Sequence, residues 1–274
     1  MKKFFSLILA AAIVPVLLAG CGGSAAGQPN ALTGVVNTDG STSMERIMGV
    51  LTEGFRREAP GVTVNYSGTG SGSGIQAVLS GACDIGLSSR PLKTAELEKG
   101  AVAHTVALDG IALVVNPENS VLHLTGAQIA GIFTGEITNW SMLGGADAPI
   151  AVYGREAGSG TRGAFESAMG VEDTCQYTNE YSSTGDIVGN VKTNPNAIGY
   201  ISLSNAGESV KLLRVDGVAC TEETIRNGSY PIQRPFLLVT REGAALSGAA
   251  QAFLDYAMSD TAAEHIAIAG AVAP

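Results

Sequence analysis

Short apolar strand segments alternate with helical segments along most of the chain, and this alternation constrains the possible folds more than any other feature. Apolar and polar residues alternate at 62–67 as in a half-buried strand, and apolar residues from Met44 to Phe55 recur at helical spacing. Repeated strand–helix alternation predicts an α/β fold with largely parallel sheets. The other predicted elements are strands at 34–37, 83–88, 150–153, 197–203 and 236–240, one or two strands within 102–115, and helices at 74–80, 94–99, 160–169, 188–193 and 246–258.

The first twenty residues have the composition of an export signal. Lys2 and Lys3 precede an uncharged apolar run at 4–19, which is shorter than the roughly 20 apolar residues of a membrane-spanning helix. Residues 18–21, Leu-Ala-Gly-Cys, resemble a bacterial lipobox, which predicts lipidation of Cys21. The alternative is an ordinary cleaved signal with an incidental cysteine. We therefore predict that residues 1–20 are a lipoprotein signal peptide and that the mature protein is extracytoplasmic.

Residues 21–32 are rich in Gly, Ser, Ala and Gln, a composition that predicts a flexible tether. The folded part then begins near Thr33 and comprises about 240 residues, enough for one large domain or two modest lobes. The formal net charge is −9, and removing Lys2 and Lys3 with the signal makes it −11. Such an acidic surface argues against nucleic acid and anionic lipid as partners, so an anionic ligand would need local donors.

Three cysteines remain after Cys21, at Cys83, Cys175 and Cys220. An exported protein can carry a disulfide, and the pair Cys175–Cys220 is the candidate; the alternative is that all three thiols are reduced. The three histidines show no metal-ligand spacing with one another or with the cysteines. We therefore predict no metal site and no cofactor.

Three predicted strand-to-helix turns share one composition. They are 39–43 (Asp-Gly-Ser-Thr-Ser), 67–74 (Ser-Gly-Thr-Gly-Ser-Gly-Ser-Gly) and 155–162 (Arg-Glu-Ala-Gly-Ser-Gly-Thr-Arg). Glycines let the backbone approach a ligand closely, and a helix start offers unpaired N–H donors and a partial positive charge. Three such turns could surround one tetrahedral anion, with Arg155 adding a charge-assisted, fork-shaped contact.

Each turn also has a plainer explanation. A Ser or Thr before a helix is often only an N-cap, and a Gly-rich turn is often only a connector. The turns lack the Gly-x-x-x-x-Gly-Lys spacing of a P-loop and the Gly-x-Gly-x-x-Gly spacing of a dinucleotide site. The sequence also has no Gly-x-Ser-x-Gly elbow, no His-Glu-x-x-His helix and no carboxylate cluster that would support catalysis. These features favour a binding protein over an enzyme.

A series of short motifs runs through the mature chain in a fixed order. They lie at 39–43, 68–74, 84–90, 132–135, 137–140, 155 with 158–161, 197–200, 230–232 and 234–235. With these motifs the chain resembles the phosphate-binding proteins of bacterial phosphate ABC importers, in the type II periplasmic-binding-protein superfamily. The resemblance implies two α/β lobes joined by a hinge, with the ligand cleft between them. Lobe 1 would comprise 33–115 plus 234–274, and lobe 2 would comprise 116–233.

The resemblance also implies which residues bind phosphate. The turns at 39–43 and 67–74 would donate hydrogen bonds to phosphate from lobe 1, and the turn at 155–162 would donate them from lobe 2. Carried over position by position, the ligands would be Thr42, Ser43, Ser71, Arg155, Ser159, Gly160 and Thr161.

One position departs from the family pattern. Many relatives carry an Asp where this chain has Ser89, in the motif that begins at Asp84. A carboxylate there can accept the proton of hydrogen phosphate, whereas sulfate has no proton to give. Ser89 can accept as well as donate, and Asp109 is the candidate substitute acceptor; its alternative role is that of a turn-forming Asp-Gly. Arg90 could be a further ligand or could pair with a neighbouring acid at the rim of the cleft.

The resemblance thus implies an extracytoplasmic, lipid-anchored solute-binding protein, and no enzyme. It would bind inorganic phosphate and deliver it to the permease and ATPase subunits of an ABC importer. The alternatives are a binding protein for another tetrahedral oxyanion such as sulfate or molybdate, a phosphate sensor acting through a membrane partner, and a secreted hydrolase such as a phosphatase or lipase.

Overall fold

The computed structural model describes residues 32–273. The predicted signal peptide, Cys21 and nearly all of the predicted tether lie outside these residues. The first strand begins at Thr33, where the folded part was expected to start. Within the described part, no helix is long and apolar enough to cross a membrane.

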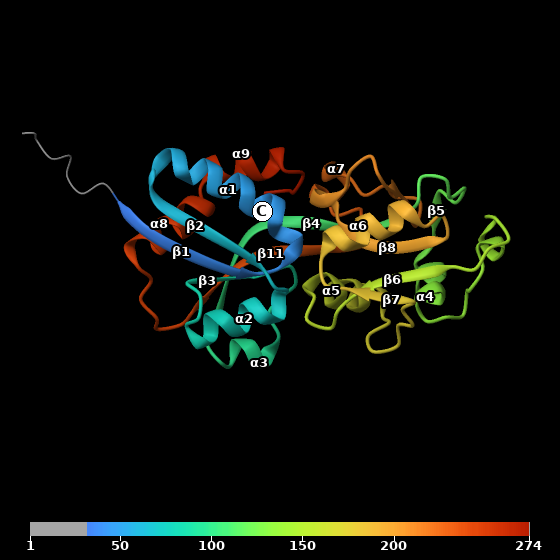
Figure 1. Ribbon diagram of the computed structural model, residues 1–274, viewed down its shortest axis with the longest axis horizontal. Coiled ribbons are helices and arrows are strands. Elements are labelled where there is room, and N and C mark those ends of the chain that lie inside the picture. The colour runs from blue at the N-terminus through green and yellow to red at the C-terminus, as the bar shows by residue number, and fades with distance from the viewer. Residues whose placement is uncertain (1–31, 274) are drawn as a thin grey trace, which may run out of the picture. The chain divides into compact units, whose positions relative to one another are not determined.

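A mixed β-sheet is the framework of the fold (Figure 1). Within residues 32–273 its strands follow the order β2-β1-β3-β11-β4-β8-β6-β7, with β9 beside β4, and a separate ladder pairs β5 with β10. Pairs at the two ends of the sheet are parallel, and the pairs that involve β4 and β11 are antiparallel. The strands are β1 (Thr33–Gly40), β2 (Gly61–Gly68), β3 (Ile85–Ser88), β4 (Ala101–Val115), β5 (His123–Leu124), β6 (Ala151–Arg155), β7 (Asn179–Tyr181), β8 (Ala197–Ser202), β9 (Lys211–Leu212), β10 (Arg214–Val215) and β11 (Gln233–Arg241).

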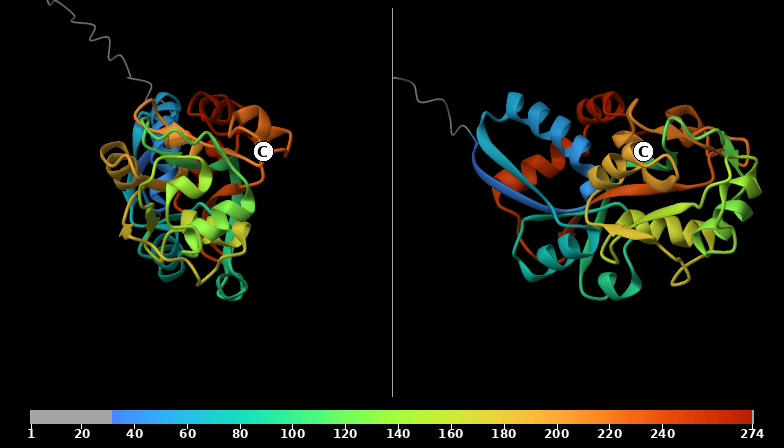
Figure 2. Two further views of the ribbon diagram at one scale, coloured as in Figure 1. Left: turned by 90° about the vertical axis from the view of Figure 1, so that its right-hand side faces the viewer. Right: turned by 45° about the vertical axis from the view of Figure 1, so that its right-hand side comes forward.

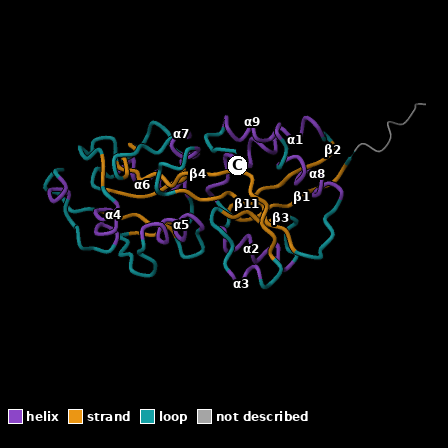
Figure 3. Tube along the Cα trace, turned by 180° about the vertical axis from the view of Figure 1, so that it is seen from behind, coloured by secondary structure: helices purple, strands orange, loops and turns teal. Residues whose placement is uncertain are grey.

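Helices cover both faces of this sheet (Figures 1 and 3). At the end formed by β1, β2 and β3, the helices α1, α8 and α9 lie on one face and α2 and α3 on the other. The α-helices are α1 (Glu45–Glu58), α2 (Ser71–Ser80), α3 (Thr94–Leu97), α4 (Gly126–Phe133), α5 (Gly160–Met169), α6 (Thr184–Thr193), α7 (Glu222–Arg226), α8 (Gly248–Ala257) and α9 (Asp260–Ile268). Short 3₁₀ turns are η1 (Thr42–Met44), η2 (Trp140–Leu143) and η3 (Leu203–Asn205).

Helix α1 shows why the local sequence folds as it does. Its buried residues include Ile47, Leu51 and Phe55, which recur at helical spacing and face the core. Glu45 lies in the first turn and Arg56 in the last, where each charge interacts favourably with the helix dipole. The apolar stripe therefore determines which face of α1 packs against the core. The charges at its two ends have the signs that the helix dipole favours.

The long strands β4 and β11 run through the middle of the fold (Figure 2) and contribute residues to two large hydrophobic cores. One core contains buried residues of β1, α1, α8 and α9, and the other contains buried residues of α4, α5, α6 and β8. On β4, Ala107 belongs to the first of these cores and Ile111 to the second. Around the start of β11, Ile232 belongs to the second core and Phe236 to the first. The two strands pair antiparallel through this region, with a register shift at Phe236/Leu237. They are therefore the elements shared by the two cores.

The α/β class and most predicted elements are confirmed, and two expectations need correction. The sheet is mixed rather than largely parallel, because β4 and β11 pair antiparallel with each other and with their neighbours. The segment 102–115 was predicted to hold one or two strands, and it lies in one strand, β4, of 15 residues, in agreement with the prediction. Helix α6 begins at Thr184, one turn earlier than predicted, because the Ser183 side chain caps it. Helices α4, α7 and α9 were not predicted.

The candidate disulfide is not formed. Cys83, Cys175 and Cys220 are free thiols in the described part of the chain. Cys175 Sγ donates to the Val171 carbonyl. Cys220 packs closely against Gly110, since a Cβ on that glycine would lie 2.6 Å from the Cys220 sulfur. The two thiols therefore occupy separate environments.

Candidate ligand-binding site

The three strand-to-helix turns of similar composition lie against one another. The carbonyl oxygen of Gly40 accepts hydrogen bonds from the backbone N–H groups of Thr69 at 2.9 Å and Gly70 at 2.7 Å. The Gly72 N–H donates to the Gly158 carbonyl at 3.0 Å, which joins the second turn to the third. The approach of the first two turns requires glycine at position 74, because a Cβ there would lie 2.2 Å from the Asp39 carbonyl oxygen. The turns thus bring together three helix starts that are far apart in the sequence.

A cluster of buried hydroxyl groups lies where these helix starts meet. Ser43 Oγ is 2.6 Å from Thr161 Oγ1 and 3.0 Å from Thr184 Oγ1. Ser43 lies in η1, Thr161 in the first turn of α5, and Thr184 is the first residue of α6. Their exposed fractions are 0%, 1% and 2%. Each hydroxyl can donate or accept, so the cluster can adapt to a ligand that presents both oxygen acceptors and O–H groups.

Arg155, at the end of β6, reaches across this cluster. Its Nη2 donates to Thr42 Oγ1 at 3.0 Å and to the Ser182 carbonyl at 2.7 Å. Its Nη1 donates to Thr184 Oγ1 at 3.2 Å, and its Nε to the Tyr181 carbonyl at 3.1 Å. No carboxylate in residues 32–273 forms an ion pair with it. Burial lowers the pKa of Arg155 from its usual value, so an anion at this position would offset the cost of burying its charge.

Ser71 and Ser89 form a second group of hydroxyls beside the first. The Ser89 N–H donates to Ser71 Oγ at 3.1 Å, and Ser41 Oγ donates to Ser89 Oγ at 2.7 Å. Gly160 fits against both side chains, since a Cβ there would lie 2.2 Å from Ser71 Oγ and 2.7 Å from Ser89 Oγ. This close approach requires glycine at position 160.

Asp109 and Arg234 form a fully buried ion pair next to the hydroxyl cluster. Arg234 Nη2 and Nε lie 2.9 Å and 3.0 Å from Asp109 Oδ2, and Ser202 Oγ donates to Asp109 Oδ1 at 2.8 Å. Burial raises the pKa of Asp109 and lowers that of Arg234, and their mutual attraction opposes both effects. Arg234 Nη1 donates to Thr161 Oγ1 at 2.7 Å. Asp109 therefore reaches the cluster through Arg234, and its role as the acceptor of a ligand proton stays a prediction.

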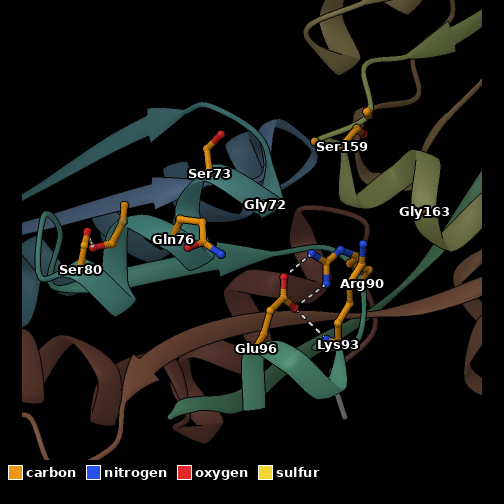
Figure 4. A pocket seen from close by; sticks show the side chains of 12 residues that line it. Gly72, Ser73, Gln76, Ser80, Arg90, Lys93, Glu96, Ser159 and Gly163 are labelled. Atoms are coloured by element: carbon orange, nitrogen blue, oxygen red, sulfur yellow. Dashed lines mark hydrogen bonds and ion pairs between the residues drawn. The ribbon is translucent and has the colours of Figure 1, made fainter. Parts of the chain in front are cut away.

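Two predicted positions lie at the edge of the cluster. Ser159 Oγ accepts from the Arg162 N–H at 3.3 Å and so caps α5. Arg90 forms a bidentate ion pair with Glu96, with distances of 2.7 Å and 2.9 Å, which is the second of the two roles considered for it. Both Arg90 and Ser159 line an open groove of about 780 Å³ beside α2 (Figure 4). Glu96 pairs with Arg90 there, and Lys93 also lines the groove. Because charges in an open groove are screened by water, the groove offers less to an anion than the buried cluster does.

Sequence reasoning missed two side chains of the cluster. Thr184 follows Ser183, and the segment Ser183 to Asp186 forms a capping box that marks a further helix start. Recognising that box would have added a fourth turn to the three. Arg234 lies in one of the motifs of the family resemblance, at 234–235, but no local pattern links it to the site, because the pairing of β11 with β4 brings it there.

The chemistry of the cluster suits an oxyanion. Its groups are hydroxyls, helix-start N–H donors and guanidinium groups, and residues 32–273 contain no group of three or more His, Cys, Asp or Glu that could hold a metal ion. A polar site of this kind, placed between helix starts of two cores that share two strands, could enclose a small anionic solute.

Known proteins define the class to which this chain belongs. A family model described as a PBP superfamily domain matches residues 23–261. The phosphate-binding protein PstS of Bacillus subtilis is 32% identical, and the match covers 94% of this chain and 90% of that protein. A crystal structure described as a phosphate ABC transporter substrate-binding protein with bound phosphate, from Clostridium perfringens, is 38% identical with a TM-score of 0.86, covering 88% of this chain and all (100%) of that one. The crystal structure of an ABC-type phosphate transport receptor from Vibrio cholerae is 35% identical with a TM-score of 0.72, and the match covers 87% of this chain and 100% of that one.

The chain therefore belongs to the periplasmic-binding-protein superfamily and, within it, to the family of phosphate-binding proteins of bacterial phosphate ABC importers. This membership confirms the predicted type II fold. It also confirms the prediction of a non-enzymatic solute-binding protein.

Proposed function

We propose that this protein binds inorganic phosphate and delivers it to an ABC importer. The observation that carries the proposal is the buried Arg155, which is held by neutral partners amid hydroxyls from separate helix starts. The named relatives are phosphate-binding proteins, and the similar structure from Clostridium perfringens is described with bound phosphate. Local donors of this kind can bind an anion although the chain carries a net charge of −9.

The proposed ligand contacts come from both cores. The fork of Arg155 would turn from its present partners to the phosphate oxygens, and the hydroxyls and helix-start N–H groups would complete the shell. The groups assigned to this shell are Thr42, Ser43, Ser71, Ser89, Arg155, Ser159, Gly160 and Thr161, with Asp109 as the acidic member of the site.

The protein is proposed to have two lobes, 33–115 plus 234–274 and 116–233, each built mainly on one of the two cores, with β4 and β11 as the hinge. Residues 111–115 at the end of β4 pack in the core of the second lobe. The direct contacts of Ser43 with Thr161 and of Gly72 with Gly158 join residues assigned to opposite lobes. Separation of the lobes would break these contacts and open the cluster to solvent. Phosphate binding would then favour closure, because the ligand contacts groups of both lobes at once.

The proposed location is the outer face of the cell membrane, with Cys21 as the lipid attachment point. The supporting features are the basic start, the apolar run and the Leu-Ala-Gly-Cys sequence that precedes a Gly- and Ser-rich stretch. The proposed partners are the permease and ATPase subunits of the importer. A lipid anchor would keep the protein close to them.

Another tetrahedral oxyanion is the second candidate ligand, because Ser89 stands where many relatives carry a carboxylate. Isothermal titration calorimetry of the purified protein with phosphate, sulfate and arsenate tests the proposal. We expect binding of one phosphate per chain, weaker binding of sulfate, and arsenate binding close to that of phosphate. Sulfate binding with no detectable phosphate binding would contradict the proposal.

A further inference from the structure

A second arginine contacts the hydroxyl cluster from the strands shared by the two cores. The Arg234 side chain is 0% exposed, and its Nη1 donates to Thr161 Oγ1 at 2.7 Å and to the Ser89 carbonyl at 3.2 Å. Both Thr161 and Ser89 belong to the proposed phosphate shell. A ligand seated against these two residues would therefore lie within reach of the Arg234 guanidinium.

The hydrogen bonds of Arg234 are incomplete on one side. Its Nη2 makes no hydrogen bond to any described residue, although it lies at ion-pair distance, 2.9 Å, from Asp109 Oδ2. A buried guanidinium normally satisfies its five donors, because each unsatisfied one costs free energy. The Arg234 guanidinium therefore has an N–H donor available for a ligand in addition to those that face Asp109.

The balance of charge around the cluster favours an anion close to both arginines. Arg155 and Arg234 are two buried guanidinium groups that contact the hydroxyl cluster, and in residues 32–273 Asp109 pairs with Arg234 whereas no carboxylate pairs with Arg155. One positive charge is therefore left without a counter-ion in a region shielded from water. An anion of at least one negative charge would compensate it.

We propose that Arg234 is a second anion-binding arginine of this site, and that Asp109 is a positioning residue that aims its guanidinium at the ligand. Asp109 and Arg234 are register partners on β4 and β11, so the pair is built into the two strands that the cores share. Ser202 Oγ holds the other oxygen of Asp109 at 2.8 Å and fixes the carboxylate. The ligand would then contact the hinge itself as well as both lobes. This inference rests on the proposed phosphate binding.

The test uses calorimetric titration with inorganic phosphate together with thermal unfolding. Arg234→Gln alone leaves Asp109 buried without a partner and can unfold the chain, so Arg234→Gln/Asp109→Asn is the informative variant, because it removes both charges. We expect it to unfold near the temperature of the parent and to bind phosphate at least tenfold more weakly. The matched control is Arg90→Gln/Glu96→Gln, which removes another poorly exposed ion pair. The control should bind phosphate as the parent does.

A second readout separates ligand contact from structural support. With ¹⁵N-labelled arginine, the Nε–H resonance assigned by its loss in Arg234→Lys should shift when phosphate is added to the parent. In Asp109→Asn that resonance should lie elsewhere before phosphate is added and should respond less to it, because the guanidinium is no longer aimed.

The outcomes are distinct. A double variant that binds phosphate within threefold of the parent, or an Arg234 resonance that phosphate leaves in place, overturns the role of Arg234 while the proposed function stands. A parent that binds no phosphate overturns the proposed function, and the role of Arg234 falls with it.

Discussion

Ser43 Oγ and Thr161 Oγ1 lie 2.6 Å apart, although 118 residues separate them in the chain. Ser43 belongs to the segment after β1, and Thr161 to the first turn of α5 on the other core. A direct contact between hydroxyls at two helix starts places donors of both cores within the span of one tetrahedral anion.

Replacing Arg155 by Ala should weaken phosphate binding by ~2–3 kcal/mol or more, because a buried charge-assisted contact is lost. Calorimetric titration of parent and variant measures the difference. Arg56→Ala is the matched control, since the Arg56 side chain is 66% exposed and lies outside the site. An Arg155→Ala protein that binds phosphate as tightly as the parent would sink the assignment.

Gly160→Ala should weaken phosphate binding while leaving each core intact. The new Cβ would lie 2.2 Å from Ser71 Oγ, so the α5 start could no longer approach α2 as closely. Gly163→Ala on the same helix is the control, because its Cβ would meet Arg90 Cδ at an ordinary contact of 3.5 Å. Circular dichroism should show both variants folded, and titration should show a loss of at least about tenfold in Gly160→Ala alone. Equal affinities in the two variants would contradict the proposed closure.

The sequence predicted the local parts of this site far better than the long-range parts. Arg155 could be assigned because it stands four residues before the Ser159-Gly160-Thr161 turn, within one strand–turn–helix unit. Arg234 reaches Thr161 only through the pairing of β11 with β4 across the sheet, and no local pattern specifies that partner. The same cause explains why the antiparallel pairs were missed.

Cys21→Ser should abolish lipidation, because the thiol is the predicted point of acylation. The variant should appear as uncleaved or soluble protein. Mass spectrometry of the N-terminal peptide from the membrane-bound parent provides the measurement, with Cys83→Ser as the control that should stay anchored. An unmodified N-terminus on the membrane-bound parent would show that the anchoring proposal is wrong.

Alkaline pH should destabilise the protein through its thiols, in addition to buried tyrosines such as Tyr200 and Tyr230, whose pKa burial also raises. Burial raises the pKa of Cys83 and of Cys175 to about 11 and that of Cys220 to about 12, from an ordinary value of 9.0. The folded state therefore holds these protons more tightly than the unfolded state does. The resulting stability is fully present below pH ~9 and is lost as the pH rises toward 11–12.

Thermal unfolding of the parent at pH 7, 9 and 11 checks this expectation. The unfolding temperature should fall between pH 9 and 11, and it should fall less steeply in Cys83→Ala/Cys175→Ala. A parent whose unfolding temperature stays constant up to pH 11 would rule out the effect.

Selectivity between phosphate and sulfate depends on which group accepts the phosphate proton. Ser89→Asp should increase the phosphate-to-sulfate affinity ratio, because it places a carboxylate beside Ser71 where it can accept that proton and repel an ion that has none. Asp109→Asn separates two roles of Asp109. If Asp109 is the direct proton acceptor predicted from the sequence, its replacement by Asn should lower the phosphate-to-sulfate affinity ratio.

As a positioning residue for Arg234, Asp109 would affect both anions alike. We expect this second outcome, with phosphate and sulfate weakened by a similar factor, because both Asp109 oxygens are already engaged, Oδ2 by Arg234 and Oδ1 by Ser202. Calorimetric titration of the parent and the two variants with both anions gives the three ratios. A ratio that falls in Asp109→Asn would restore Asp109 as the proton acceptor, and a ratio that does not rise in Ser89→Asp would show that position 89 does not contact the ligand proton.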